Sequence, residues 1–356
     1  MKIGILTQHF LLNYGGIIQN FALQQVLLKL GHEPLTFEHD TCYSRARWLL
    51  RTVKQMLQTR SLKGLPVYPV YKGRIGNENF IKFVLKNIRS VTVKDFTSNL
   101  TQKYGLDAYV VGSDQVWRPA FNLGTRLGNM FLDFADEKVK KLSYAASFGC
   151  KEWEYTEEQE LMCAKLAKRF DAISVREASG VNLCKEHFEV DATLVLDPTL
   201  LLDKEDYCKI CNDVPEKQKH IFVYSLVVSE GVLAVAEKVA EVMELPIVVK
   251  QAGSKVKKED TIENWLTEFR DADYVVTDSF HGMVFSIIFN KPFAIVMNPS
   301  GGNDRYISLL SQLGLMERIV KDGTLPSDSV IDWQEVNLQL ANLRETSLDF
   351  LRNNLK

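Results

Sequence analysis

The sequence lacks the patterns that mark secreted, membrane-spanning and nucleic-acid-binding proteins. Its 356 residues contain no apolar run close to the roughly 20 residues that span a bilayer, and Met1-Lys2 leads into a short strand pattern without a signal peptide. Neither sign of charge is in clear excess, because 43 basic and 45 acidic residues give a formal net charge of −2. We therefore expect a cytoplasmic protein that binds no nucleic acid.

Cysteine is too sparse and too scattered for a disulfide framework. The six cysteines lie at positions 42, 150, 163, 184, 208 and 211, and only Cys208 and Cys211 form a C-x-x-C pair. A structural zinc site of this kind usually needs a second pair, so we expect reduced thiols and no zinc.

Apolar runs rich in Val, Ile, Leu and Tyr alternate with helical patterns along most of the chain. Such continuous runs are typical of the central strands of a parallel sheet that is covered on both faces. The candidate strands are Ile3–Thr7, Ala108–Gly112, Lys141–Ser147, Ala172–Val175, Ile221–Leu226, Ile247–Lys250, Tyr274–Thr277 and Phe293–Val296. The prediction is an α/β fold with two doubly wound, Rossmann-like domains that face each other across a cleft.

A domain boundary is predicted near "VLDPTLLL", where Asp197-Pro198 interrupts the pattern. The N-terminal α/β domain then covers residues 1–197. The C-terminal α/β domain covers residues 198–356 and ends in a helix from about Asp332. Within the first domain, residues 41–74 form a basic insertion with eight lysine or arginine residues and no acidic residue.

Polar residues and glycines follow several of the predicted strands. Ligands bind beyond the carboxyl ends of strands in open parallel sheets, so these residues are the candidate site. They are Asn13, Tyr14, Gly15, Gly16, Ser113, Asp114, Gln115, Arg176, Asp278, Ser279, His281 and Gly282. An imidazole, carboxylates, a guanidinium and backbone N–H donors suit an anionic substrate and a proton transfer.

Each of these residues also has an ordinary structural interpretation. His281 is either a structural hydrogen-bonding residue or a proton shuttle that titrates near neutral pH. Asp278 and Ser279 can cap the following helix, and Asp114 can belong to a turn. Arg176 is either an interdomain ion pair or a bidentate clamp for phosphate or carboxylate. Gly282 permits a close approach of backbone or ligand.

The segment "NYGG", residues 13–16, stands between a strand and a helix, where many proteins bind phosphate. It lacks the lysine and the spacing of G-x-x-x-x-G-K-[ST], and it is not G-x-G-x-x-G. An anion there would depend on N–H donors and the helix dipole alone. This argues against tight binding of a nucleoside triphosphate.

Seven segments together resemble the polysaccharide pyruvyl transferase family. In this chain they are "NYGGIIQNFALQQVLLKLG", "AYVVGSDQVW", "FLDFADEKVKKLSYAASFG", "AISVRE", "VLDPTLLL", "VVTDSFHGMVFSIIFNKPF" and "NDRYISLLSQLGL". They occur in the family's order and extend from about residue 3 to residue 318. The combination of "GSDQVW" with "DSFHG" is specific to the family.

The resemblance implies a fold similar to GT-B glycosyltransferases, with the active site in the cleft. It implies transfer of the enolpyruvyl unit of phosphoenolpyruvate to two hydroxyls of one sugar, giving a cyclic ketal and phosphate. The implied acceptor is a lipid-linked oligosaccharide of a bacterial capsule, exopolysaccharide or cell-wall polymer. No metal and no cofactor is implied, because cationic side chains can neutralise the phosphate.

The resemblance also assigns roles to individual residues. His281 matches the family's proposed catalytic histidine, and Arg176 matches an arginine proposed to hold phosphoenolpyruvate. Some members carry an arginine where this chain has Ser279, so the second anion clamp is expected from Arg305, which follows the "NPSGG" loop, or from Lys250.

We expect His281 to shuttle the proton, with Asp114 or Asp278 orienting the imidazole or positioning a hydroxyl. The segment "NYGG" becomes one wall of the cleft, opposite His281. There Asn13 and the N–H groups of Gly15 and Gly16 meet either the acceptor sugar or the leaving phosphate.

Other interpretations remain open at this point. Basic and apolar residues interleave in the insertion 41–74, so this segment is either an ordinary surface helix or a peripheral contact with an anionic membrane. The alternatives for the whole chain are a GT-B glycosyltransferase that uses a nucleotide sugar and a non-catalytic glycan-binding component of a polysaccharide-assembly complex.

Overall fold

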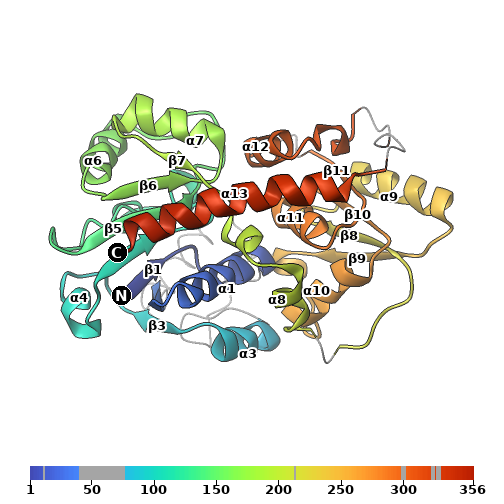
Figure 1. Cartoon of the computed structure of the whole chain (residues 1–356), viewed down its shortest axis with the longest axis horizontal. Helices are drawn as coiled ribbons and strands as arrows, with labels where there is room; N and C mark the ends of the chain where they lie inside the picture. Colours follow the sequence, from blue (N-terminus) through green and yellow to red (C-terminus); the bar gives the residue numbers. More distant parts are fainter. Residues whose placement is uncertain (11–12, 40–76, 212–213, 298–301, 322–324, 326–329) are drawn as a thin grey trace, which may run out of the picture.

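Two parallel β-sheets lie side by side in the molecule (Figure 1). The computed structural model describes residues 1–10, 13–39, 77–211, 214–297, 302–321, 325 and 330–356. Within these residues the first sheet has the strand order β3-β2-β1-β4-β5-β6-β7, and the second has the order β11-β10-β8-β9. All pairings between these strands are parallel, which confirms the predicted α/β fold with two Rossmann-like halves.

The strands of the first sheet are β1 Lys2–Leu6, β2 Glu33–His39, β3 Ser90–Val93, β4 Ala108–Val111, β5 Lys140–Ala146, β6 Ala172–Val175 and β7 Thr193–Leu194. Those of the second sheet are β8 Ile221–Ser225, β9 Ile247–Gln251, β10 Tyr274–Thr277 and β11 Phe293–Ile295. The sequence predicted all of these except β2, β3 and β7. The three missed strands lie toward the edges of the first sheet and have exposed positions, so they lack the continuous apolar run on which the prediction depended.

The helices are α1 Tyr14–Lys29, α3 Glu78–Asn87, α4 Asn99–Tyr104, α5 Arg126–Met130, α6 Glu157–Ala167, α7 Ala178–Leu183, α8 Lys204–Cys208, α9 Glu230–Met243, α10 Ile262–Asp271, α11 Phe280–Ile288, α12 Asp304–Gln312 and α13 Trp333–Asn354. Helix α1 begins four residues earlier than its apolar pattern indicated, so Gly15 and Gly16 belong to its first turn. Its residues are buried on nearly every side, which is why the pattern shows little amphipathicity.

Each sheet carries a hydrophobic core on both faces, because alternate residues of a strand point to opposite sides. In β4, Ala108 and Val110 belong to one core, whereas Tyr109 and Val111 belong to another. The core that contains Val110 continues into the second sheet and includes Phe222 of β8. One continuous core therefore joins the two halves of the molecule.

An aromatic cluster lies at the junction of the two halves. Tyr14, at the start of α1, stacks on Trp265 of α10 with a centroid distance of 5.2 Å and an interplanar angle of 20°. Its ring also meets Phe80 edge-on at 4.7 Å and Tyr224 at 5.8 Å. Aromatic contacts of this kind add to the free energy gained from burial, so the cluster fixes the start of α1 against the second half.

Helix α13 crosses from the second half back to the first (Figure 1). The predicted helix from about Asp332 is present, and the Asp332 carboxylate caps it. Its last turns pack on the first sheet, where Phe350 contacts Tyr144 and Lys140 Nζ donates to the Asn354 carbonyl at 2.9 Å. The end of the chain thus belongs structurally to both halves, which differs from its predicted place in the second domain alone.

Two further findings concern membrane-spanning helices and disulfide bonds. None of the helices among the described residues is both long enough and apolar enough to cross a bilayer. Within the same residues the cysteines are free, namely Cys150, Cys163, Cys184, Cys208 and Cys211.

Candidate active site

A cavity of about 440 Å³ opens between the two halves. It lies at the carboxyl ends of the central strands, where the strand order reverses in each sheet and the following loops separate. The first half contributes Gln8, His9, Asn13, Asp114, Gln115, Ala120, Phe121 and Arg126, and the second contributes Leu226, Ser279, Phe280, His281 and Arg305. Residues that lie far apart in the sequence therefore meet at one place.

The turn between β10 and α11 presents His281 to the cavity. Ser279 is the N-cap of α11, and its hydroxyl accepts a hydrogen bond from the Gly282 N–H at 3.4 Å. A Cβ at position 282 would lie 2.1 Å from Oγ1 of Thr277, so glycine is needed for this tight strand-to-helix turn. The sequence analysis predicted a close approach at Gly282, and the approaching group is the side chain of Thr277. This contact positions the neighbouring residue, His281.

His281 packs directly against the first turn of α1 from the other half. A Cβ at position 15 would lie 2.0 Å from Nδ1 of His281, a distance that no side chain tolerates. Only glycine at this position leaves room for the imidazole. The "NYGG" segment is therefore in contact with His281.

The imidazole of His281 is neutral at pH 7. Burial lowers the pKa of His281 to about 4, with Asp197 opposing this change and Arg176 adding to it. Nε2 lies 3.9 Å from Oδ2 of Asp197 and has no hydrogen-bond partner among the described residues. A neutral imidazole with a free ring nitrogen can accept a proton, and the facing carboxylate stabilises the imidazolium that results.

Asp197 is a fully buried carboxylate with several donors around it. It accepts hydrogen bonds from Arg176 Nη1 at 2.7 Å and from Ser113 Oγ at 3.2 Å. The backbone N–H and the hydroxyl of Thr199 add two more at 3.0 and 2.7 Å. Burial opposes its ionisation, but Arg176, His281 and Thr199 outweigh burial and hold the pKa of this carboxyl below its usual value.

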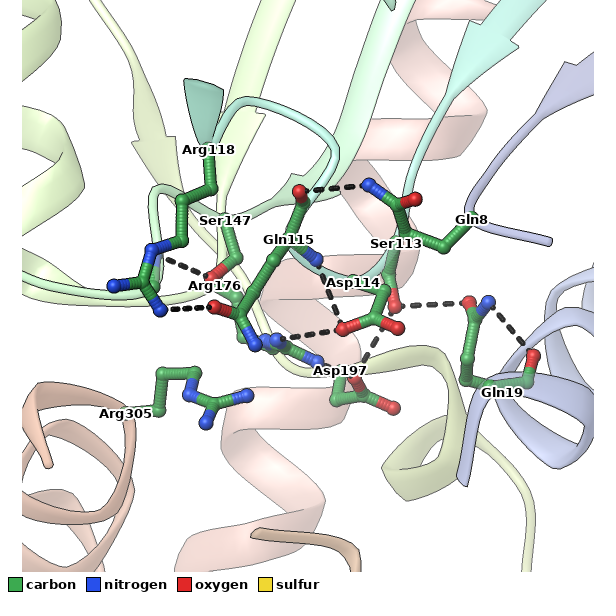
Figure 2. A network of polar contacts seen from close by, with 12 residues as sticks. Gln8, Gln19, Ser113, Asp114, Gln115, Arg118, Ser147, Arg176, Asp197 and Arg305 are labelled. Atoms are coloured by element: carbon green, nitrogen blue, oxygen red, sulfur yellow. Dashed lines mark hydrogen bonds and ion pairs between the residues drawn. The ribbon is translucent and has the colours of Figure 1, made fainter. Parts of the chain in front are cut away.

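Arg176 joins two carboxylates behind the cavity (Figure 2). Its Nη2 lies 3.5 Å from Oδ1 of Asp114, in addition to the contact of Nη1 with Asp197. The side chain is only 1% exposed, and its Nε and Nη2 have no hydrogen-bond partner among the described residues. Arg176 is absent from the cavity wall, and the two carboxylates balance its charge, so the structure favours the ion-pair interpretation of this residue.

Arg305 brings a second guanidinium to the same region from α12. Figure 2 shows it directed toward Arg176 and Asp197, and its centre lies 5.5 Å from the ring centroid of Phe280. Arg176 lies 4.7 Å from that ring. Burial and the neighbouring Arg176 lower the pKa of Arg305, and no acidic partner lies within ion-pair distance among the described residues. Arg305 therefore brings a positive charge to the cavity without a direct ion pair among the described residues, although Asp114 and Glu177 act on it from a greater distance.

Other predicted residues are at the cavity or next to it. Asn13, the N-cap of α1, makes no capping hydrogen bond with its side chain, and Gly16 lies beside it. Gln115 lines the cavity and accepts a hydrogen bond from Arg118 Nη1 at 3.2 Å. Ser113 is buried behind the cavity, where it links Asp197 to the amide of Gln19 (Figure 2).

Asp278 does not lie where the sequence analysis placed it. Its carboxylate accepts hydrogen bonds from Ser225 Oγ at 2.8 Å and from the backbone N–H groups of Leu226 and Val227 at 2.6 and 3.2 Å. These contacts hold the loop that follows β8. The carboxylate that faces the imidazole is Asp197.

Two more predicted residues lie away from the cavity. Tyr14 is fully buried in the aromatic cluster between the halves, so its ring supports α1 and does not line the site. Lys250 forms an ion pair with Asp260 at 2.7 Å and is absent from the cavity wall. Of the two expected second clamps, Arg305 is the one that reaches the cavity.

The sequence analysis did not assign Asp197, Arg126 or His9 to the site. Asp197 follows β7 closely, so the rule that selects residues after strands would have found it if β7 had been recognised. His9 follows β1 in the same way. Arg126 lies on the short helix α5, in a segment whose pattern gives no sign of its position.

Together these side chains can bind an anion and move a proton. Arg305 lines the cavity as a cation, the chemistry of a neutral imidazole allows His281 to accept and return a proton, and Asp197 lies where it would stabilise the charged ring. No three His, Cys, Asp or Glu side chains within the described ranges are grouped so that they could hold a metal ion. The basic insertion 41–74 lies outside the described residues, so its contact with a membrane stays a prediction.

We predict that Gly15→Ala displaces the imidazole of His281, because the added methyl group overlaps the ring. Overpacking of this kind costs about 1–3 kcal/mol of unfolding free energy. The measurements are chemical denaturation and the NMR signals of the His281 ring. The matched control is Gly16→Ala, whose Cβ would meet its nearest neighbour, Asn13, at an ordinary 3.4 Å. Equal effects of the two substitutions would contradict this packing.

We predict that His281 makes the protein less stable in acid. Its pKa is about 4 in the folded state and 6.5 in the unfolded state, so the unfolded state binds more protons between these values. The unfolding free energy therefore falls as the pH decreases from 6.5 to 4, by on the order of 3 kcal/mol. His281→Gln should lack this part of the pH dependence in denaturant titrations. Identical curves for the two proteins would disprove the burial of a neutral imidazole.

Comparisons with known proteins identify a family. The family model described as polysaccharide pyruvyl transferase matches residues 13–300. A glycosyltransferase from Rickettsia africae is 11% identical, with a TM-score of 0.46 over 99% of this chain and 94% of that one. A putative UDP-N-acetylglucosamine 2-epimerase from Listeria monocytogenes is 11% identical, with a TM-score of 0.48 over 99% and 90%. No curated protein matches the sequence.

Proposed function

The chain belongs to the polysaccharide pyruvyl transferase family, and we propose that it transfers the enolpyruvyl unit of phosphoenolpyruvate to two hydroxyls of one sugar. The products are a cyclic pyruvate ketal and inorganic phosphate. In this proposal the acceptor is a lipid-linked oligosaccharide, met in the cytoplasm during the synthesis of a surface polysaccharide. The enzyme acts without a metal or a cofactor, and phosphoenolpyruvate is its donor.

The observation that carries this proposal is one cavity between the two halves that is lined by the guanidinium of Arg305 and the neutral imidazole of His281, with the guanidinium of Arg176 buried behind it. Phosphoenolpyruvate has a carboxylate and a phosphate, so it needs cations at both ends. Arg305 lines the cavity without an ion-pair partner among the described residues, and behind it Nε of Arg176 is buried without a hydrogen-bond acceptor among these residues. Charge-assisted hydrogen bonds from guanidinium to carboxylate or phosphate are among the strongest in proteins.

The proton balance of the reaction allows one residue to carry out both proton transfers. One sugar hydroxyl adds to C2 of phosphoenolpyruvate in the same step in which C3 gains one proton. The second hydroxyl then displaces phosphate from C2. The two hydroxyls lose two protons in all, of which one ends on C3 and the other on phosphate.

His281 is suited to move these protons because it is neutral before the reaction. It accepts the proton of the attacking hydroxyl at its ring nitrogen, and it returns that proton to C3 or to the leaving phosphate. Asp197, 3.9 Å from Nε2, stabilises the ring while it is charged. Gly15 holds the ring from the other side and restricts its orientation.

We predict that His281→Gln abolishes the release of phosphate from phosphoenolpyruvate in the presence of a sugar acceptor, because the amide cannot carry a proton. Circular dichroism should show an intact fold. His187→Gln is the control, since this partly exposed residue stacks on Trp153 away from the cavity. Full turnover in His281→Gln would refute the role. Consumption of a sugar nucleotide, with phosphoenolpyruvate untouched, would favour the glycosyltransferase alternative.

We predict that Arg305→Gln raises the KM for phosphoenolpyruvate by about 10- to 100-fold, the loss expected for one hydrogen bond to a charged group. Lys250→Gln is the matched control, because Lys250 is paired with Asp260 outside the cavity. Steady-state phosphate release at varied phosphoenolpyruvate measures both variants. A larger increase in this KM for Lys250→Gln than for Arg305→Gln would assign the second anion clamp to Lys250.

A further inference from the structure

Arg126 is a third cation at the cavity, and the proposed reaction does not use it. It lies at the start of α5 in the first half and lines the cavity. Its Nη2 donates to Oε1 of Gln8 at 3.1 Å, which directs the guanidinium. Burial lowers the pKa of Arg126, and among the described residues no carboxylate lies within ion-pair distance to compensate it.

The charge of Arg126 acts on other residues than the charges of Arg176 and Arg305 do. The charges that act on His281 are those of Asp197, Arg176, Asp114 and Arg305. Arg126 acts instead on His9, whose pKa is lowered to about 4 by burial, by Arg126 and by His39. Nε2 of His9 is buried and has no hydrogen-bond partner among the described residues. This side of the cavity therefore holds positive charge and a polar atom that a bound anion would stabilise.

The same side of the cavity carries an exposed aromatic ring. Phe121 lines the cavity and is 48% exposed, and the guanidinium of Arg118 lies 5.1 Å from its ring centroid. Binding sites for small organic ligands usually combine such apolar surface with a few directed polar groups.

We propose that Arg126, directed by Gln8, binds an anionic group on the sugar acceptor, with Phe121 against the sugar ring. This inference rests on the proposed function, since it describes the acceptor side of the same cavity. A partly buried guanidinium without an ion-pair partner destabilises the protein when no ligand is bound. A phosphate or carboxylate would offset this free energy through charge-assisted hydrogen bonds. The anion is either a phosphoryl group on the anomeric oxygen or the carboxylate of a neighbouring uronic acid.

The test compares acceptors that differ only in charge. The neutral probes are the methyl glycosides of glucose, galactose and mannose. The first charged set consists of the corresponding hexose 1-phosphates, and the second of disaccharides of each hexose with glucuronic acid at the reducing end. Phosphate release at saturating phosphoenolpyruvate gives kcat/KM for each acceptor. The wild-type protein should prefer one charged set by about 10- to 100-fold.

Variants of Arg126 decide whether that preference comes from this side chain. Arg126→Gln should bring the ratio of charged to neutral acceptor close to one, and Arg126→Lys should retain part of it. The matched control is Arg169→Gln, which removes a guanidinium that is bonded to the Ala135 carbonyl away from the cavity. That variant should keep the wild-type ratio.

The proposal is overturned if Arg126→Gln keeps the charge preference, or if it raises the KM for phosphoenolpyruvate, which would place Arg126 at the donor. Calorimetric titration of the wild-type protein and Arg126→Gln with each of the two charged acceptor sets, in the absence of phosphoenolpyruvate, separates the two proposals. Binding that depends on Arg126 without any turnover of phosphoenolpyruvate would support the anion subsite and reject the proposed transfer. Equal binding by both proteins would reject the subsite.

Discussion

The buried carboxylate of Asp197 is the group on which the rest of the site depends. A charge removed from water is costly unless it is paired and hydrogen-bonded, and Asp197 meets both conditions through Arg176, Ser113 and Thr199. It lies just before the chain enters the second half, and it faces His281 of that half. Loss of Arg176 would leave this carboxylate without its counter-charge at the centre of the molecule.

The position of His281 follows from this network and from the contact between the two halves. The imidazole is confined by Asp197 on one side and by the first turn of α1 on the other, where Gly15 leaves just enough room. Tyr14, one residue earlier, fixes that turn in the aromatic cluster with Trp265. The packing that joins the halves thus also sets the geometry and the low pKa of the candidate base.

The sequence predicted those parts of the structure that depend on local pattern. Central strands were found because burial on both faces demands continuous apolar runs, and His281 and Arg176 were found because they follow such strands. Of the two carboxylates predicted beside His281, Asp114 lines the cavity, whereas Asp278 holds the loop after β8. Asp197, which faces the imidazole, was missed because the short strand β7 before it has no apolar run. Arg126 was missed because long-range packing brings it to the cavity.

The central claim is that this cavity joins the pyruvyl carbon to two oxygens of one sugar. Phosphoenolpyruvate labelled with ¹³C at C2, incubated with the protein and hexose glycosides, tests it directly by NMR. We expect the label to appear in a ketal carbon bonded to two sugar oxygens, together with an equal amount of inorganic phosphate. Labelled pyruvate without a ketal, or unchanged phosphoenolpyruvate with every acceptor, would contradict the account.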